Sequence, residues 1–337
     1  MGAARDAVKR LAWRAGLTGA VARRRLGDSL TVLMFHRVLD RADPRWPGAT
    51  RQYTLDPQEF ALALDVAGGL FTPVSLRDVV EARAGGRPLP PAAMLVSFDD
   101  GWSDNLHYAA PELARRGWPA VLFAAADWIG SARPFWQEEW HEALATGRIR
   151  RADLADHLPA ELADISVQAA LARLEPEARS ALFRALGGGG RPAIPAFLTP
   201  AELARLAAVG WAVGGHGCSH EPLTAVPDGA GEIASARQSL TAMTGAPVDS
   251  LSFPHGRWDA ALVQAARASG HALCFTSDRL ANACPGGRPA SDLLGRVEIH
   301  AGLLADPDGT LRPERLANFL ATLPVGVLEA GEAALAA

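Results

Sequence analysis

Residues 95–102 read Leu-Val-Ser-Phe-Asp-Asp-Gly-Trp, an apolar run that ends in two adjacent acids and a glycine. The apolar part is typical of a buried strand, so the acids fall where that strand ends. Adjacent carboxylates repel each other, and folding alone gives no reason to place Asp99 and Asp100 there. A cation removes the difficulty, because successive strand side chains point in opposite directions: one acid can ligate it while the other stays free as a base. The alternative is that Asp100 or Asp104 caps a helix beginning near Asn105.

Two histidines more than a hundred residues downstream supply matching ligands. They stand four residues apart in His216-Gly217-Cys218-Ser219-His220, after a predicted strand and a Gly-Gly turn. This spacing places both imidazoles on one face of a helix or a tight turn. A carboxylate and two neutral imidazoles form a standard three-ligand zinc site that leaves one position open for water. The sequence therefore predicts that Asp100, His216 and His220 bind a divalent metal ion, with Zn²⁺ as the expected ion.

Short apolar runs alternate with helical patterns along most of the chain. The predicted strands are Thr31–Phe35, Met94–Phe98, Ala120–Ala124, Trp211–Gly214, Ser250–Phe253, Ala272–Thr276 and Arg296–Ile299. The predicted helices are Pro57–Ala67, Leu76–Ala82, Asn105–Arg116, Pro200–Ala208, Glu232–Met243 and Asp259–Ser269. This alternation indicates a mainly parallel sheet with right-handed crossovers. An open doubly wound sheet and a (β/α) barrel both fit. The barrel is favoured because both motifs follow predicted strands, where the loops of a barrel converge.

The alternation fails between about residues 135 and 197, where the chain is rich in Ala, Leu and Glu and helical in pattern. We interpret this part as a helical insertion between two strands and not as a separate catalytic domain. The predicted organisation is a basic segment over residues 1–28, a barrel over 29–325 that contains the insertion, and a C-terminal tail over 326–337.

The N-terminal segment contains seven basic residues, and its apolar residues recur at roughly helical spacing. No uninterrupted apolar stretch or small-residue cleavage site follows, and no window is long enough for a transmembrane helix, so we expect no secretory signal. Two interpretations stay open. The segment rests on an anionic membrane surface as a peripheral contact, or it is a solvated helix packed beside the first strand, which is the simpler case.

Composition limits the classes of partner and compartment. A formal net charge of −4 gives no electrostatic case for a nucleic-acid partner. The three cysteines form no Cys-x-x-Cys pair, which fits a reducing compartment. We therefore expect a cytoplasmic protein, with membrane association as the alternative that the basic segment leaves open.

Three motifs together resemble those of the polysaccharide deacetylase family (NodB homology, carbohydrate esterase family four). They are Ser97-Phe98-Asp99-Asp100-Gly101, the His-x-x-x-His of residues 216–220, and Phe253-Pro254-His255-Gly256. Residues 33–38 and the pair Phe135-Trp136 resemble a bacterial branch of it. The likeness covers roughly residues 30–300 and matches the insertion poorly. It implies a distorted (β/α)7 barrel with a helical insertion, and divalent-metal hydrolysis of N-acetyl groups on amino sugars.

The resemblance also implies roles for individual residues. Asp99 would be the general base that deprotonates the attacking water, beside the ion held by the three predicted ligands. The backbone N–H of His255 would stabilise the oxyanion. The family uses a histidine near the last strand to protonate the leaving amine, which makes His300 the candidate general acid. Strand alternation predicts that Arg296, Glu298 and His300 share one face and one polar site.

The chain departs from the family pattern at three positions. Gly217 replaces a Ser or Thr whose hydroxyl would brace the histidine loop. Ser252 stands where the family usually has the arginine that steadies the base, and His255 stands where it has tyrosine. The arginine must therefore come from another place in the chain, and Arg296 is our candidate.

Four residues are candidates for contact with substrate: His36, His255, Trp136 and Trp258. His36 ends the first predicted strand and could face the metal or a sugar, or be a satisfied polar residue at the barrel mouth. The flat indoles of Trp136 and Trp258 suit the apolar faces of sugars, although large aromatics near strand ends are more often core residues.

These features predict a hydrolase that removes acetyl groups from an N-acetylated sugar in a polymer or in a lipid-linked or nucleotide-linked glycan. An intracellular glycan intermediate is the favoured substrate, since no secretion signal is expected. Two alternatives stay open. One is hydrolysis of another amide, such as a formamido sugar or a cyclic ureide. The other is a carbohydrate-binding protein on a barrel that has lost catalysis.

Overall fold

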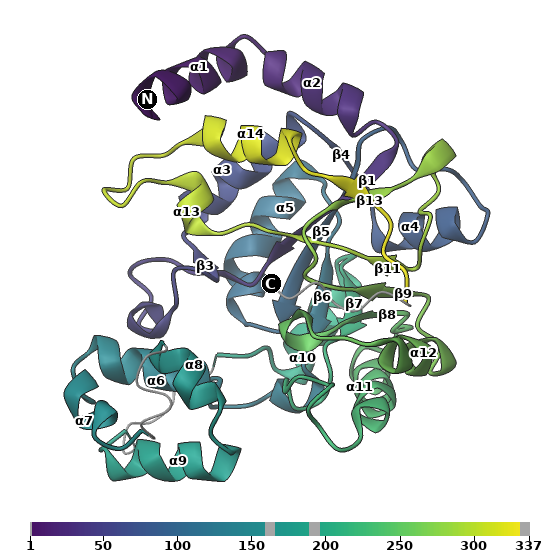
Figure 1. Cartoon of the computed structure of the whole chain (residues 1–337). Coiled ribbons are helices and arrows are strands. Elements are labelled where there is room, and N and C mark those ends of the chain that lie inside the picture. The colour runs from purple at the N-terminus through teal and green to yellow at the C-terminus, as the bar shows by residue number, and fades with distance from the viewer. Residues whose placement is uncertain (1, 159–165, 189–195, 331–337) are drawn as a thin grey trace.

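The computed structural model describes residues 2–158, 166–188 and 196–330. Within them, eleven strands form one curled sheet in which parallel neighbours dominate (Figure 1). They are β1 (Ser29–Phe35), β4 (Thr72–Pro73), β5 (Ala93–Asp100), β6 (Val121–Ala124), β7 (Ala212–Gly215), β8 (Ser250–Ser252), β9 (Leu273–Phe275), β10 (Ala281–Ala283), β11 (Leu293–Leu294), β12 (Val297–Glu298) and β13 (Val325–Gly326). The parallel order is β11-β9-β8-β7-β6-β5-β1, and β10 runs antiparallel to β1.

The last barrel strand is split between the two edges of the sheet. β11 pairs with β9, and only two residues later β12 pairs with β1 at Leu33 and Met34. The segment Leu293–Glu298 therefore passes from one edge of the curled sheet to the other. This arrangement makes the barrel distorted, and it carries Arg296 across its interior.

Helices cover the outside of the sheet and the two ends of the molecule. They are α1 (Gly2–Arg14), α2 (Leu17–Arg25), α3 (Pro57–Gly68), α4 (Leu76–Arg83), α5 (Ala110–Arg116), α6 (Trp136–Ala145), α7 (Arg151–Ala155), α8 (Val167–Ala172), α9 (Pro176–Ala185), α10 (Pro200–Ala208), α11 (Gly229–Thr244), α12 (Ala260–Ala268), α13 (Ala301–Leu304) and α14 (Pro313–Ala321). Short helical turns lie at Trp46–Gly48, Asn105–Ala109, Ala126–Trp128, Pro254–Gly256 and Pro285–Gly287. A separate pair, β2 (Arg37–Val38) and β3 (Thr54–Leu55), follows β1. No described helix has the length and apolar character needed to span a bilayer.

Local sequence explains where several barrel helices begin. α3, α4 and α10 each start with a reciprocal capping box, in which the cap side chain accepts a backbone N–H and an acid three residues later returns the bond. At α3, for example, Asp56 accepts from Glu59 while the Glu59 carboxylate accepts from the Asp56 N–H. These caps fix the strand-to-helix turns that the alternating sequence pattern predicts.

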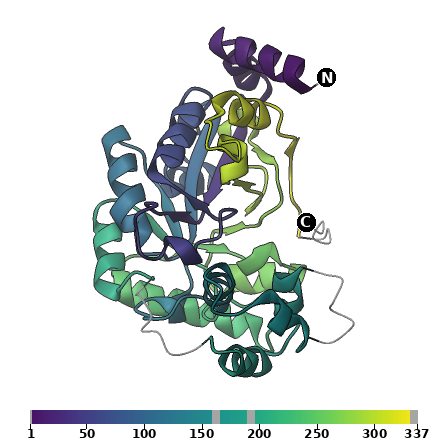
Figure 2. The ribbon, with the colours of Figure 1, turned by 90° about the vertical axis from the view of Figure 1, so that its left-hand side faces the viewer.

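The helices α6 to α9 lie together at the end of the molecule opposite α1 and α2 (Figures 1 and 2). They form their own small core around Trp140 and Phe183. Arg37 of β2 links them to the barrel, since its buried guanidinium binds both Asp104 and Glu138 of α6. Phe197 returns the chain to the barrel by an isolated bridge to Trp102.

The structure confirms the predicted fold class. Each of the seven predicted strands and six predicted helices has a counterpart, with ends that differ by a few residues at most, except that the helix predicted from Asn105 opens with a π-helical turn before α5. The predicted segment limits stay predictions. β13 reaches Gly326 and pairs with β10, and Leu328 is buried, so the first residues assigned to the tail pack against the barrel.

Candidate active site

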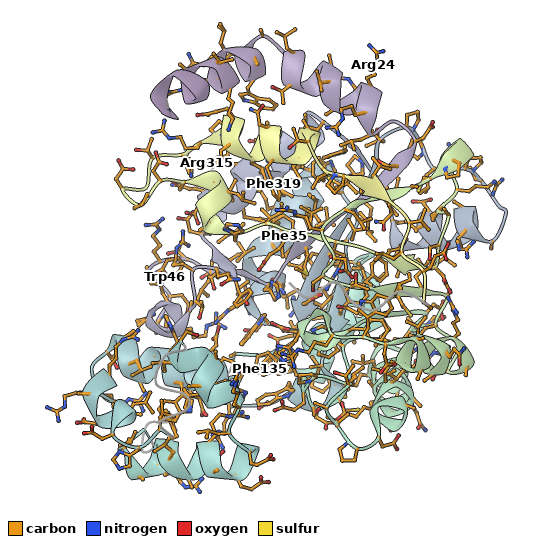
Figure 3. The ribbon with its side chains drawn as sticks, viewed as in Figure 1. Arg24, Phe35, Trp46, Phe135, Arg315 and Phe319 are labelled. Carbon is orange, nitrogen blue, oxygen red and sulfur yellow. The ribbon has the colours of Figure 1, made fainter. Side chains whose placement is uncertain are left out.

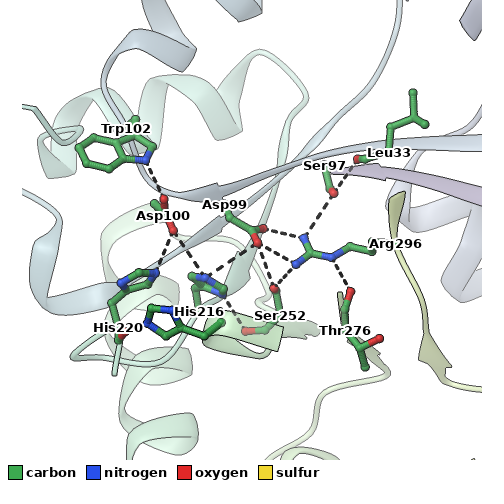
Figure 4. A network of polar contacts seen from close by, with 11 residues as sticks. Leu33, Ser97, Asp99, Asp100, Trp102, His216, His220, Ser252, Thr276 and Arg296 are labelled. Atoms are coloured by element: carbon green, nitrogen blue, oxygen red, sulfur yellow. Dashed lines mark hydrogen bonds and ion pairs between the residues drawn. The ribbon is translucent and has the colours of Figure 1, made fainter. Parts of the chain in front are cut away.

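Asp99 lies at the end of β5 and is almost completely buried. Arg296 binds both of its oxygens: Nη1 donates to Oδ1 and Nη2 donates to Oδ2, each at 2.7 Å (Figure 4). The Nε of Arg296 donates to the carbonyl oxygen of Thr276 at 3.0 Å, which fixes the guanidinium. Burial acts to raise the pKa of Asp99, but the interactions of its carboxylate with Arg296, His216 and His36 together outweigh that effect and hold the pKa below its usual range. Asp99 is therefore a carboxylate at neutral pH.

Asp100 turns its carboxylate toward the same group of side chains as Asp99. Its φ of 81° lies in the left-handed region, which breaks the alternation expected along a strand. The indole Nε1 of Trp102 donates to Oδ2 at 2.7 Å. Oδ1 is buried without a hydrogen-bond partner among the described residues, and it lies 3.1 Å from Nε2 of His220 and 3.6 Å from Nε2 of His216. The expectation that alternation separates the two acids is therefore wrong, because the strained backbone at Asp100 brings both into one site.

His216 presents a neutral imidazole to both carboxylates. Its Nδ1 lies 2.8 Å from the carbonyl oxygen of Ser252, which can only accept, so the ring proton is on Nδ1 and the lone pair of Nε2 faces the acids. Burial lowers the pKa of His216 to about 4. Nε2 also lies 3.9 Å from Oδ2 of Asp99. The uncharged ring is in the state that a metal ligand requires.

The ligand atoms of Asp100, His216 and His220 all lie within 4.8 Å of one another, and these residues fit a divalent cation. The orphaned Oδ1 of Asp100 is the decisive observation, because an unpaired buried carboxylate oxygen facing an imidazole lone pair is unfavourable until a cation lies between them. Carboxylate and imidazole ligands suit zinc among other divalent ions.

Comparison with known proteins agrees with this geometry. A family model described as polysaccharide deacetylase matches residues 86–274, which contain Asp99, Asp100 and the histidine pair. The chain belongs to the polysaccharide deacetylase family. Sequence analysis predicts this membership from three motifs, and the prediction is confirmed.

Individual members of this family show how far the likeness extends. The poly-β-1,6-N-acetyl-D-glucosamine N-deacetylase of Escherichia coli K12 is 30% identical over 99 residues, which cover 26% of this chain and 15% of the length of that protein. Among solved structures, IcaB from Ammonifex degensii has a TM-score of 0.57 at 20% identity, with 88% of this chain and 98% of that chain covered. The Streptococcus pyogenes deacetylase PplD has a TM-score of 0.56 at 16% identity, with the same coverage. At these identities the structural likeness concerns the fold.

The deacetylase-family loop that holds the histidines lacks its usual hydroxyl, and Glu232 of α11 takes over the bracing. Its carboxylate accepts the backbone N–H groups of Cys218 at 3.0 Å and of Ser219 at 3.1 Å. Gly217 has a φ of 68°, and a Cβ there would lie 3.2 Å from the Glu232 carboxylate. The glycine thus permits both the turn and the approach of the acid.

Ser252 connects Asp99 to the candidate metal ligand His216. Its hydroxyl accepts from Nη2 of Arg296 at 2.8 Å and lies 3.4 Å from Oδ2 of Asp99, while its carbonyl accepts from His216. A serine at the position where the family usually has arginine leaves room for Arg296, which arrives from the split last strand. The structure places Arg296 against Asp99, as sequence analysis expects.

Aromatic side chains enclose the open side of His220. Phe135, directly before α6, stacks on the imidazole with ring centroids 4.0 Å apart and an interplanar angle of 11°. Phe135 belongs to a cluster with Trp102, Trp128 and Phe197, and it lies between the insertion and the barrel (Figure 3). The insertion therefore contributes a wall of the site.

Both predicted substrate-contact histidines lie at the site. His255 occupies the left-handed region with a φ of 57°, and its Nε2 donates to the carbonyl oxygen of His220 at 3.0 Å. Burial lowers the pKa of His255 to about 4. His36 contacts the ring of Tyr53 and is close enough to act electrostatically on both Asp99 and Asp100.

The two predicted tryptophans have other partners, and His300 and Arg296 do not share one face. Trp258 is buried in a core cluster and its Nε1 donates to Asp278, so in this structure the indole has no free face for a sugar and serves the core. Trp136 is half-buried in the insertion, where the guanidinium of Arg179 lies 4.0 Å from its ring centroid. His300 lines a pocket with Arg51, Gln52 and Glu298, whereas Arg296 reaches into the interior of the barrel. The prediction that Arg296, Glu298 and His300 share one face is therefore wrong, because β12 is too short to continue the strand alternation on which it depends.

Sequence reasoning missed Phe135, Ser252, Trp102 and Glu232 as parts of the site. Trp102 is two residues from Asp100, so its proximity could have been argued. No local signal identifies Glu232, because it acts from a helix on the far side of the histidine loop.

Proposed function

We propose that the chain is a metal-dependent hydrolase that removes N-acetyl groups from an amino-sugar glycan. The supporting observation is the division of labour between adjacent acids. Asp99 is ionised and bound at both oxygens by Arg296, while Oδ1 of Asp100 faces two imidazoles. A hydrolase that activates water beside a cation needs one acid in each role.

The residues present can perform amide hydrolysis as follows. Asp100, His216 and His220 would hold the ion, which when bound supplies Lewis-acid chemistry that polarises the amide carbonyl and acidifies water; Zn²⁺ is the ion we propose. Asp99 retains lone pairs beyond those that bind Arg296 and accepts the proton from the attacking water. The backbone N–H of His255 is our candidate donor to the oxyanion, and His300 our candidate donor to the leaving amine.

The proposed substrate is a glycan that carries N-acetylated amino sugars. Support comes from the E. coli relative, which is named for acting on poly-β-1,6-N-acetyl-D-glucosamine, although this chain spans 15% of the length of that protein. We propose the cytoplasm as the compartment and a glycan intermediate as the substrate. The supporting observation is that Cys218, Cys274 and Cys284 are all free thiols, as is usual where thiols stay reduced.

Acetate release from N-acetylated oligosaccharides tests the proposal. The purified chain is assayed with β-1,6-linked N-acetylglucosamine oligomers as prepared, after treatment with a chelator, and after readdition of Zn²⁺. We expect release that the chelator abolishes and Zn²⁺ restores, because the ion would polarise the amide carbonyl and acidify the attacking water. Formate release from a formamido sugar without acetate release would instead support a different amide substrate. Sugar binding with no hydrolysis at any metal concentration would contradict catalysis.

Replacing Arg296 by methionine will move the acid limb of the pH–rate profile upward. In the parent protein the guanidinium is the strongest of the groups that lower the pKa of Asp99 against the effect of burial. Without it, burial dominates and raises that pKa, so the base is protonated at a pH where the parent is still active. For the same reason the variant's free energy of unfolding rises as the pH falls, because protonation of Asp99 removes a buried, unpaired charge. Profiles of kcat/KM and of urea unfolding against pH measure both effects.

The matched control is Arg267→Met. Arg267 makes the same two-bonded pairing with Asp292, at 2.7 Å for each bond, but at the surface. Loss of this surface ion pair should lower the free energy of unfolding by at most about 1 kcal/mol and leave the acid limb of the pH–rate profile unchanged. An acid limb equally unmoved in Arg296→Met would show that Arg296 does not set the ionisation of the base.

A further inference from the structure

The N-terminal helices α1 and α2 expose an unusual number of apolar side chains. Nine large hydrophobic side chains are exposed among the described residues, and four of them lie on these two helices. They are Val8 (66% exposed), Leu11 (70%), Leu17 (59%) and Val21 (50%). We call these four side chains the apolar ridge.

The ridge is the outer face of helices whose inner face is already docked. Thr18, Gly19 and Ala22 are the buried side of α2, and α1 and α2 both pack on α14. Arg23 donates to the carbonyl oxygen of Gly69, and Arg25 donates to that of Ala321. The helix pair is thus fixed to the barrel by one side, and the ridge points away from the core.

Basic side chains surround the ridge. Residues 1–25 contain seven basic residues and one acid, in a chain whose formal net charge is −4. Lys9, Arg14 and Arg24 are exposed on the same two helices, and Arg24 projects outward from α2 (Figure 3). Apolar residues flanked by basic ones on a helix surface match the interface of an anionic bilayer.

We propose that α1 and α2 dock this chain on the surface of a membrane that contains anionic lipids. The apolar ridge enters the headgroup boundary, and Lys9, Arg14 and Arg24 bind lipid phosphates. A second copy of the chain fits less well, because a two-fold contact through this face would bring the basic residues of both copies together. The four apolar side chains argue against a nucleic-acid backbone, which would leave them in water.

The position of this face sets the orientation of the bound enzyme. α1 and α2 lie beside the start of β1, at the end of the molecule opposite the insertion (Figures 1 and 2). Asp99 and Asp100 lie at the opposite, C-terminal end of β5, which runs parallel to β1. A chain docked through the ridge therefore directs the end of the barrel that holds Asp99 and Asp100 toward the aqueous phase, where glycan chains extend from the membrane surface.

Co-sedimentation with vesicles tests the docking. The 337-residue chain is mixed with vesicles of phosphatidylcholine alone and with vesicles containing about 30% phosphatidylglycerol, and the partition coefficient is measured at low and high salt. We expect binding to the anionic vesicles only, weakened by salt. Arg14→Gln with Arg24→Gln should lower the partition at least about tenfold, from the electrostatic contribution of two basic residues. Leu11→Ser with Leu17→Ser should lower it by a similar factor.

Matched controls separate docking from unrelated surface effects. Val209→Ser removes a 70% exposed apolar side chain directly after α10, and Arg77→Gln removes a basic side chain on α4. Both should partition like the parent, and all variants should keep the parent's thermal midpoint and its acetate release from soluble oligomers. Binding lost equally in the control variants, or no binding to anionic vesicles, would overturn the proposal. So would a parent dimer that Leu11→Ser with Leu17→Ser makes monomeric.

Discussion

Replacing Asp99 by asparagine will lower kcat by about 10²- to 10⁴-fold while the protein still binds its metal ion. The expected loss is that of a general base, because the amide cannot accept the proton from water. Metal retention is expected because the ligand atoms belong to Asp100, His216 and His220, and Asp99 is paired with Arg296. Acetate release and metal content by mass spectrometry are the measurements.

The Asp99→Asn variant also leaves the buried guanidinium of Arg296 without a counter-charge, which should lower the free energy of unfolding by about 3–5 kcal/mol. A double variant, Asp99→Asn with Arg296→Met, removes both charges and should recover much of that stability. If the double variant folds, binds metal and remains inactive, the loss is chemical and not structural. Turnover of either variant at the parent's rate would reject Asp99 as the base.

Replacing the neighbouring Asp100 by asparagine will have the opposite pattern: metal affinity falls by at least about a hundredfold, and activity falls with it. The amide is isosteric, so the indole of Trp102 keeps an acceptor, but the charge that faces His216 and His220 is gone. A hard or borderline cation binds a neutral amide far more weakly than a carboxylate.

Isothermal titration with Zn²⁺ measures this loss, and raising the metal concentration should restore part of the turnover. Asp99→Asn is the matched control, since it makes the same chemical change one residue away. Asp100→Asn should therefore lose metal affinity, whereas Asp99→Asn should bind a full complement of metal and lose turnover. Equal metal affinity in both would contradict the assignment of Asp100 as a ligand.

The regular part of the fold could be predicted from sequence because its strands and helices have distinct periods. The strands around Val32, Leu95 and Leu122 are buried on both faces and read as continuous apolar runs, and the capping boxes mark helix starts. β10, β13 and the β2–β3 pair are two or three residues long and contain no period to detect. They exist because neighbouring backbone groups lie close enough to pair.

The candidate active site likewise has residues that local sequence predicts and residues that it does not. Asp99, Asp100, His216 and His220 lie in two short motifs whose chemistry is readable locally. Trp258 shows the limit, because sequence cannot tell an indole that faces a sugar from one that faces the core, and here the core covers it. Sequence also cannot predict the hydrogen bonds between Glu232 and the histidine loop, because α11 approaches that loop only in the folded chain.

The sequence by itself determined the fold class, the family and the residues that can bind a cation, because each depends on residue types at short spacing. Only the tertiary structure decided how they meet. It turned Asp100 toward the side of Asp99 by a strained backbone, brought Arg296 to the base through the split last strand, and stacked Phe135 of the insertion on His220. The physical reason is that the contacts of Arg296 with Asp99 and of Phe135 with His220 join residues far apart in the chain, so they depend on how the sheet curls and closes, which no local pattern specifies.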